Sequence, residues 1–123
     1  MTISESPSSV GSKMIDWAYV NGLRAGIGQD SFNEIVQVFF DETEDTLKRL
    51  EDAHRPIDIT EELHFLQGSA LNMGFVGFSA ECRKSHDMST DNADDMRHTA
   101  GLLATYAKSK TLFLSALSET GLR

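Results

Sequence analysis

Apolar residues recur at steps of three and four along most of the chain, which is the spacing of amphipathic α-helices. The first stripe runs through Trp17, Val20, Leu23 and Ile27, and predicts a short helix that ends at Gly28. No alternation of apolar and polar residues extends over more than a few positions, so strands are not expected. The pattern predicts an all-α protein.

Four longer helices are predicted by the stripes that follow, near residues 31–53, 58–73, 75–88 and 92–119. Ser31 with Glu34, and Asp58 with Glu61, have the spacing of capping boxes and predict where the first two of these helices begin. Gly74 is a natural stop for the helix that starts near Asp58.

The stripes also predict which residues form the core. In helix 31–53 the expected core residues are Phe32, Ile35, Val36, Phe39, Thr43, Leu47 and Leu50. In helix 92–119 they are Met96, Ala100, Leu103, Ala107, Leu114 and Leu117. Four amphipathic helices with short connections imply an antiparallel four-helix bundle, with the short N-terminal helix as its cap.

Length and composition agree with one compact domain. The 123 residues are 40% hydrophobic and 24% charged, which is ordinary for a globular protein. Residues 1–13 are serine-rich and are expected to be disordered, so the bundle is assigned to residues 14–123. No apolar run has the length of a membrane span, and the first residues lack the apolar core of a signal peptide. The expected location is cytoplasmic.

The charge balance excludes some classes of partner and site. A net charge of −8 repels nucleic acid and anionic membrane surfaces, so neither is expected as a partner. The single cysteine, Cys82, rules out an internal disulfide and a CxxC zinc site. There is no glycine-rich phosphate loop, so we expect neither a nucleotide site nor autonomous catalysis. Any phosphoryl group would have to arrive on another protein.

The chain has four histidines, His54, His64, His86 and His98, and no two of them are four residues apart. A helical metal site of the HExxH type is therefore excluded. His64 follows the expected core residue Leu63, which places it about 100° around the helix and toward water. A neutral imidazole is a nucleophile near pH 7 without an activating base.

Gly68 lies one turn after His64, inside the predicted helix, where glycine costs about 1 kcal/mol relative to alanine. Two interpretations are equally good from the residues alone. Either the missing side chain lets a partner approach the imidazole, or it lets two helices pack closely.

The segment HFLQGSALNMG, residues 64–74, resembles the signature of histidine-containing phosphotransfer (HPt) domains. That family has a histidine followed by Lys, Gly and Ser and then by a further Gly, and this chain matches at His64, Gly68, Ser69 and Gly74. Phe39-Phe40 and Cys82 also lie where the family has similar residues. The resemblance covers most of residues 16–117.

The resemblance implies a stand-alone phosphocarrier of a multistep phosphorelay. His64 would accept the phosphoryl group through Nε2, and Gly68 would clear the docking surface. The expected partners are receiver domains of hybrid histidine kinases and of response regulators. The receiver would supply Mg²⁺, so no metal or cofactor is expected on this chain.

One position departs from the family pattern, because Gln67 stands where the family has lysine. A neutral glutamine cannot offset the charge of a phosphoryl group as lysine does, so we expect weaker retention of phosphate rather than weaker docking. The alternative function is therefore a receiver-binding module that sequesters or modulates response regulators with little phosphotransfer.

His86 is a possible neighbour of the phosphorylated ring. A hairpin that turns at Gly74-Phe75 would place His64 level with Ser85 and His86. An ordinary exposed histidine near a helix end is the simpler interpretation. A third hypothesis, a metal-dependent hydrolase that uses His64 and His86, rests only on the presence of histidines and acidic residues.

Overall fold

The computed structural model describes residues 13–52, 58–89 and 95–119, with side chains described through residue 87 and from residue 99 to 117. Within these residues the chain is all-helical, as predicted, and contains no strand. The five helices of the described residues are α2 (Trp17–Ile27), α3 (Gln29–Glu51), α4 (Ile59–Asn72), α5 (Val76–Ser89) and α6 (Asp95–Glu119). None of them is long and apolar enough to cross a membrane.

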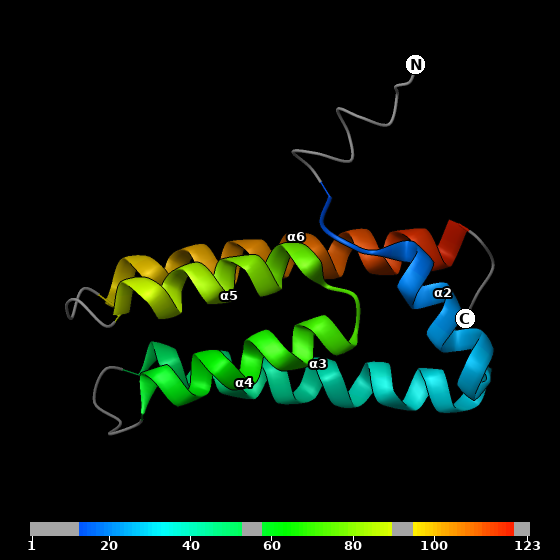
Figure 1. Ribbon diagram of the computed structural model, residues 1–123, viewed down its shortest axis with the longest axis horizontal. Coiled ribbons are helices and arrows are strands. Elements are labelled where there is room, and N and C mark those ends of the chain that lie inside the picture. The colour runs from blue at the N-terminus through cyan, green and yellow to red at the C-terminus, as the bar shows by residue number, and fades with distance from the viewer. Residues whose placement is uncertain (1–12, 53–57, 90–94, 120–123) are drawn as a thin grey trace, which may run out of the picture.

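Helices α3 to α6 lie side by side, and each runs in the opposite direction to the one before it (Figure 1). The short α2 crosses one end of this group, next to the ends of α3 and α6. Helix α5 packs against both α4 and α6, and α3 packs against α4 and α6 as well. The arrangement leaves one side of the α4–α5 pair facing solvent, and the exposed His64 lies on that side.

The core is rich in aromatic rings, and Phe113 of α6 is at its centre. Its ring stacks on Trp17 of α2 at a centroid distance of 5.4 Å and an interplanar angle of 8°. It also contacts Phe75, in the turn before α5, at 5.2 Å. Fully buried aromatic side chains provide the largest apolar area per residue, so these contacts hold α2 and α6 to the α4–α5 turn.

The caps of α4 are as predicted. The Asp58 carboxylate accepts a hydrogen bond from the Glu61 N–H at 3.2 Å and satisfies an amide at the helix start. After α4, Gly74 adopts a φ of 78°, in the left-handed region that favours glycine. A Cβ there would come within 2.7 Å of Val20. This turn is also held by the segment before α2, because the Asp16 N–H donates to the Gly74 carbonyl at 2.8 Å.

The predicted start of α3 is wrong. The helix begins at Gln29, after an N-cap glycine, Gly28, with φ 91° and no side-chain capping bond. Ser31 and Glu34 therefore lie inside the helix, where both are exposed. The left-handed glycine separates α2 from α3 one turn earlier than the capping-box pattern indicates. The core residues predicted for this helix are buried or half-buried.

The predicted core face of α6 is wrong at three positions. Ala100, Ala107 and Leu114 are exposed, whereas Leu103 and Leu117 are half-buried and pack against the core, as predicted. The buried face of this helix instead consists of Thr99, Leu102, Tyr106, Ser109 and Phe113. The position of Met96 cannot be compared, because its side chain lies outside the described residues. Because this face includes the polar residues Thr99 and Ser109, it does not form an apolar stripe in the sequence. Tyr106 can be buried because its hydroxyl donates a hydrogen bond to the Glu44 carboxylate at 2.8 Å.

The domain limits are untested at the N-terminus. Residues 1–12 of the segment predicted to be disordered lie outside the described residues. The same holds for residues 92–94, at the predicted start of the last helix, and for Ala53, at the predicted end of helix 31–53.

Candidate functional site

His64 lies on the solvent side of α4, beside the buried stripe of that helix. Leu63 and Leu66 are almost completely buried, whereas His64 is exposed. Consecutive helical residues are separated by about 100°, so the His64 side chain is turned away from the direction in which Leu63 points. The predicted exposure of His64 is confirmed, and its imidazole is accessible to a partner protein.

Gly68 leaves an open patch one turn after His64. A Cβ built on this residue meets no atom within 4 Å, and the residue is exposed. Close helix packing, one of the two interpretations of this glycine, is therefore wrong. The other interpretation, access for a partner, agrees with the structure. A larger side chain at this position would project into solvent and toward any partner that docks at His64.

His86 of α5 lies next to His64, as the hairpin register predicted. The centroids of the two imidazole rings are 6.4 Å apart, and the rings are tilted by 53°. Ser85, the other candidate neighbour, is buried and points into the core. The Nδ1 of His86 is 3.7 Å from the carboxylate of Asp87, so the ring that faces His64 has an acidic neighbour.

His64 and His86 are too few ligands for a metal site by themselves. In the part of the chain that the structure describes, no three His, Cys, Asp or Glu side chains are grouped so that they would hold a metal ion. Nothing in this region supports the hydrolase hypothesis, which needs further ligands around His64 and His86. His54 and the side chain of His98 lie outside the described residues.

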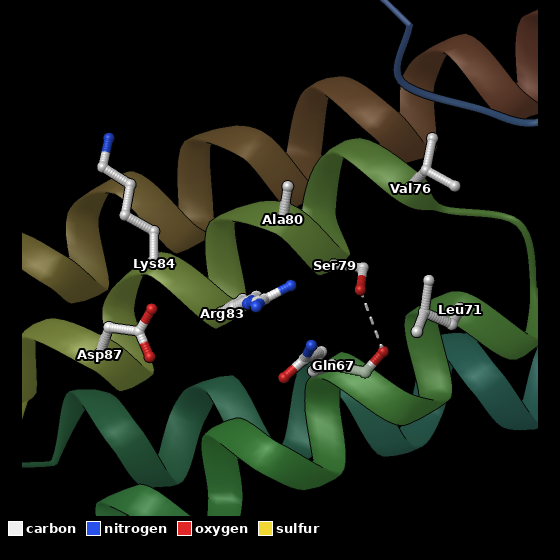
Figure 2. Close-up of a pocket in the computed structure, with 8 residues that line it drawn as sticks. All are labelled: Gln67, Leu71, Val76, Ser79, Ala80, Arg83, Lys84 and Asp87. Carbon is white, nitrogen blue, oxygen red and sulfur yellow. Dashed lines mark hydrogen bonds between the residues drawn. The ribbon is translucent and has the colours of Figure 1, made fainter.

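A groove of about 470 Å³ runs between α4 and α5, next to these histidines. Its lining residues are Gln67, Leu71, Val76, Ser79, Ala80, Arg83, Lys84 and Asp87 (Figure 2). The Ser79 hydroxyl donates to the Gln67 main-chain carbonyl at 3.3 Å and joins the two helices across the groove floor. Figure 2 shows the Arg83 guanidinium directed over the groove toward Gln67, whereas Lys84 extends away from it.

Apolar side chains are exposed on the same side of α4. Phe65 and Leu71 are 43% and 51% exposed, large fractions for residues of this size. Val76, at the start of α5, is half-buried and lines the groove. Exposed apolar surface of this kind is typical of protein docking sites.

Cys82 is not available as a second nucleophile. Its side chain is fully buried, and burial raises the pKa of the thiol to about 12. A thiol with this pKa is almost entirely protonated near pH 7 and is a poor nucleophile. Cys82 is therefore part of the packed core.

The Hpt domain family model matches residues 34–119, which is most of the chain and includes α4 and α5. This protein belongs to the Hpt domain family. No curated protein and no solved structure matches it. Membership implies histidine phosphotransfer in two-component signalling, in which Hpt domains carry phosphoryl groups rather than catalyse a reaction of their own.

The match includes every residue expected from the sequence to form the Hpt site, namely His64, Gln67, Gly68, Ser69 and His86. The structure brings His64 and His86 together, and Gln67 and Gly68 lie one turn beyond His64 on α4. Ser69 is half-buried on the same turn. The functional roles of these residues in this Hpt domain remain predictions.

Ser79, Ala80 and Asp87 of the groove were not identified from the sequence. The register that places His64 level with His86 also places Ser79 and Ala80 opposite the turn of α4 that contains Gln67 and Leu71. Extending it along α5 would have identified them. Their small or polar side chains show no distinctive pattern by themselves, so this register was the available signal.

Proposed function

We propose that this Hpt domain is a stand-alone phosphocarrier that accepts a phosphoryl group on His64 from a receiver domain and passes it to another receiver. The observation that carries the proposal is the exposed imidazole of His64 beside the open patch at Gly68, on a helix within the Hpt match. Transfer between two proteins needs both an exposed nucleophile and space for the partner to approach it.

The proposed phosphoryl transfer requires no proton acceptor on this chain. Neutral His64, protonated at Nδ1, attacks the phosphorus of the receiver's aspartyl phosphate with the Nε2 lone pair. The N–P bond forms, the P–O bond to the aspartate breaks, and the carboxylate leaves with its electron pair. Passing the group to a second receiver reverses these changes. The receiver contributes Mg²⁺, which offsets phosphoryl charge in both directions.

The receiver is expected to dock on the α4–α5 side. The exposed side chains of Phe65 and Leu71 supply apolar area, and the Gly68 patch lets the receiver's aspartate reach His64. Partners of this kind are found on hybrid histidine kinases and response regulators. The cytoplasmic location follows from the same partners, and neither nucleic acid nor membrane is involved.

The architecture that supports this site is, we infer, the antiparallel four-helix bundle of α3 to α6 with α2 as its cap. The inference is supported by the packing of α5 on α4 and α6 and of α3 on α4 and α6. The stacking of Trp17 on Phe113 supports the role of α2, because it holds this helix against the end of the group.

His86 is proposed to support the phosphorylated ring. With its centroid 6.4 Å from that of His64, its imidazole is close enough to donate a hydrogen bond to a phosphoryl oxygen placed between the rings. Replacing His86 with alanine should lower the equilibrium yield of phosphohistidine without abolishing transfer. An unchanged yield would remove His86 from the site.

The function is tested with a panel of purified receiver domains that are phosphorylated with labelled acetyl phosphate and freed of excess reagent. Mixing with this protein should produce acid-labile label on the wild type and none on His64→Gln. Labelled ATP alone should leave the wild type unlabelled. Acid-stable label, or label that persists in His64→Gln, would overturn the assignment.

Binding without transfer is the alternative, favoured by the neutral Gln67 in place of the family's lysine. The same panel separates the two functions if complex formation is measured in parallel. Receivers that bind tightly but never transfer their label would indicate a sequestering module. Transfer from at least one receiver would support the phosphocarrier.

A further inference from the structure

Arg83 is the cation that the α4–α5 side places over the groove beside the His64 turn. We propose that Arg83 balances the charge of the phosphoryl group on His64 and so takes over, from α5, the task that Gln67 cannot perform from α4. This inference rests on the proposed function of His64 as the phosphoryl acceptor.

The register of the two helices places Arg83 at the right level. His64 faces His86, with ring centroids 6.4 Å apart. Gln67 lies one turn after His64 on α4, and Arg83 lies one turn before His86 on α5. Because the two helices run in opposite directions, these two steps lead to the same level of the groove. Gln67 and Arg83 both line it, on opposite walls.

The Arg83 side chain is also free to respond to a new charge. It is exposed, and among the described residues its guanidinium has neither a hydrogen bond nor an ion pair. Figure 2 shows it directed toward Gln67, while the neighbouring Lys84 points away. A guanidinium without a fixed partner offers up to five N–H donors in a planar fork that fits phosphoryl oxygens.

The expected effect is on retention of the phosphoryl group. Hydrolysis of phosphohistidine passes through a loose transition state in which the phosphoryl group loses negative charge. A nearby cation therefore stabilises the phosphorylated ground state more than the transition state, and slows hydrolysis. For an exposed charge pair this corresponds to a change of about two- to five-fold.

The test phosphorylates the protein chemically with phosphoramidate, so that no cognate receiver is required. Phosphohistidine decay is followed by ³¹P NMR, with His64→Gln as the blank for the other histidines. Arg83→Gln should shorten the lifetime of the His64 signal by about two- to five-fold, and Arg83→Lys should keep part of the wild-type lifetime. The phosphoryl group of Arg83→Gln should also titrate at a higher pH than that of the wild type.

Lys84→Gln is the matched control, because it removes the same charge one residue away. Its lifetime should equal that of the wild type. The double variant Gln67→Lys/Arg83→Gln moves the cation back to α4 and should restore the lifetime. A purely structural role for Arg83 would show no such rescue. Equal lifetimes for wild type and Arg83→Gln would overturn the inference, as would an equal loss in Lys84→Gln.

Failure of this inference can be distinguished from failure of the proposed function. If receivers transfer label to His64 but Arg83→Gln leaves the lifetime unchanged, only the role of Arg83 is wrong. If no receiver transfers label to His64, the proposed function fails and the role of Arg83 in a relay fails with it.

Discussion

Replacing Gly68 with glutamine adds a side chain one turn after His64, at a position where an added Cβ meets no atom within 4 Å. The residue lies inside α4 rather than at its end. The substitution therefore changes two separable properties, the helix propensity of α4 and the space available to a docked receiver.

The effect on stability is a small gain. Glutamine is favoured over glycine inside a helix by about 0.5 kcal/mol, and the added Cβ meets no clash that would oppose this gain. For a domain of this size the melting temperature should rise by about 1–3 °C. The gain is measured by thermal unfolding followed by circular dichroism.

The effect on transfer is a large loss. A glutamine one turn from His64 would hold the receiver's aspartate away from Nε2, and a displacement of about 1 Å can cost on the order of a hundred-fold in rate. The initial rate of label transfer from a phosphorylated receiver should fall by at least about ten-fold. Gly68→Ala adds one methyl group and should give a smaller decrease.

Gly22→Gln is the matched control. Gly22 is also an exposed helical glycine with no atom within 4 Å of a Cβ, but it lies in α2. It should give a similar stability gain and a normal transfer rate. If Gly68→Gln accepted phosphate at the normal rate, the account of docking at this patch would be refuted. A loss of stability would refute the structural part of the argument.

Three further predictions concern stability and reactivity. Gly74→Ala should lower the free energy of unfolding by about 1–3 kcal/mol in urea titrations, because φ is 78° and the Cβ would press on Val20; equal stability would contradict the turn geometry. The pKa of Glu44 is lowered from its usual value of 4.5, mainly by the hydrogen bond from Lys110. The ionised carboxylate therefore stabilises the fold at pH values above 4.5, and this contribution is lost as the pH falls through the lower pKa of the folded state. Glu44→Gln should thus be less stable at neutral pH and lose less stability on acidification, which urea titrations from about pH 6 to 3 would show; parallel curves would argue against the pair. Cys82, with a pKa of about 12, should react with a thiol reagent far more slowly in the folded protein than in urea, and equal rates would indicate that it is not buried.

The exposure of His64 was predictable because the stripe around it is purely apolar. Leu63, Leu66 and Ala70 are all buried, and they define the orientation of α4 without reference to any other helix. The capping box at Asp58 predicted where this helix begins. Together, these local patterns were enough to predict that the His64 imidazole faces solvent. The family resemblance then gave this residue a chemical role.

The core face of α6 was not predictable in this way. Tyr106 is buried because Glu44 of α3 accepts its hydrogen bond, and Thr99 and Ser109 are buried beside it. The spacing of apolar residues along this helix predicts Ala107 and Leu114 as core residues instead, but both are exposed. Which face of α6 is buried depends on partners from a distant helix, and these are specified only by the tertiary structure.

The same limit applies to the groove and to the space around Gly68. The sequence left open whether this glycine serves packing or access, because the answer depends on which atoms of other helices come near it. The surroundings of Arg83 were likewise undetermined, since its direction over the groove follows from the packing of α5 on α4.

The central claim, that Nε2 of His64 is the atom that carries the phosphoryl group, is tested most directly by NMR of the imidazole nitrogens. The protein is labelled with ¹⁵N-histidine and mixed with a receiver domain phosphorylated by acetyl phosphate. The account predicts that one ring acquires an N–P coupling at Nε2 and that this signal is missing from His64→Gln. A coupling on another histidine, or none with any receiver that binds, would contradict it.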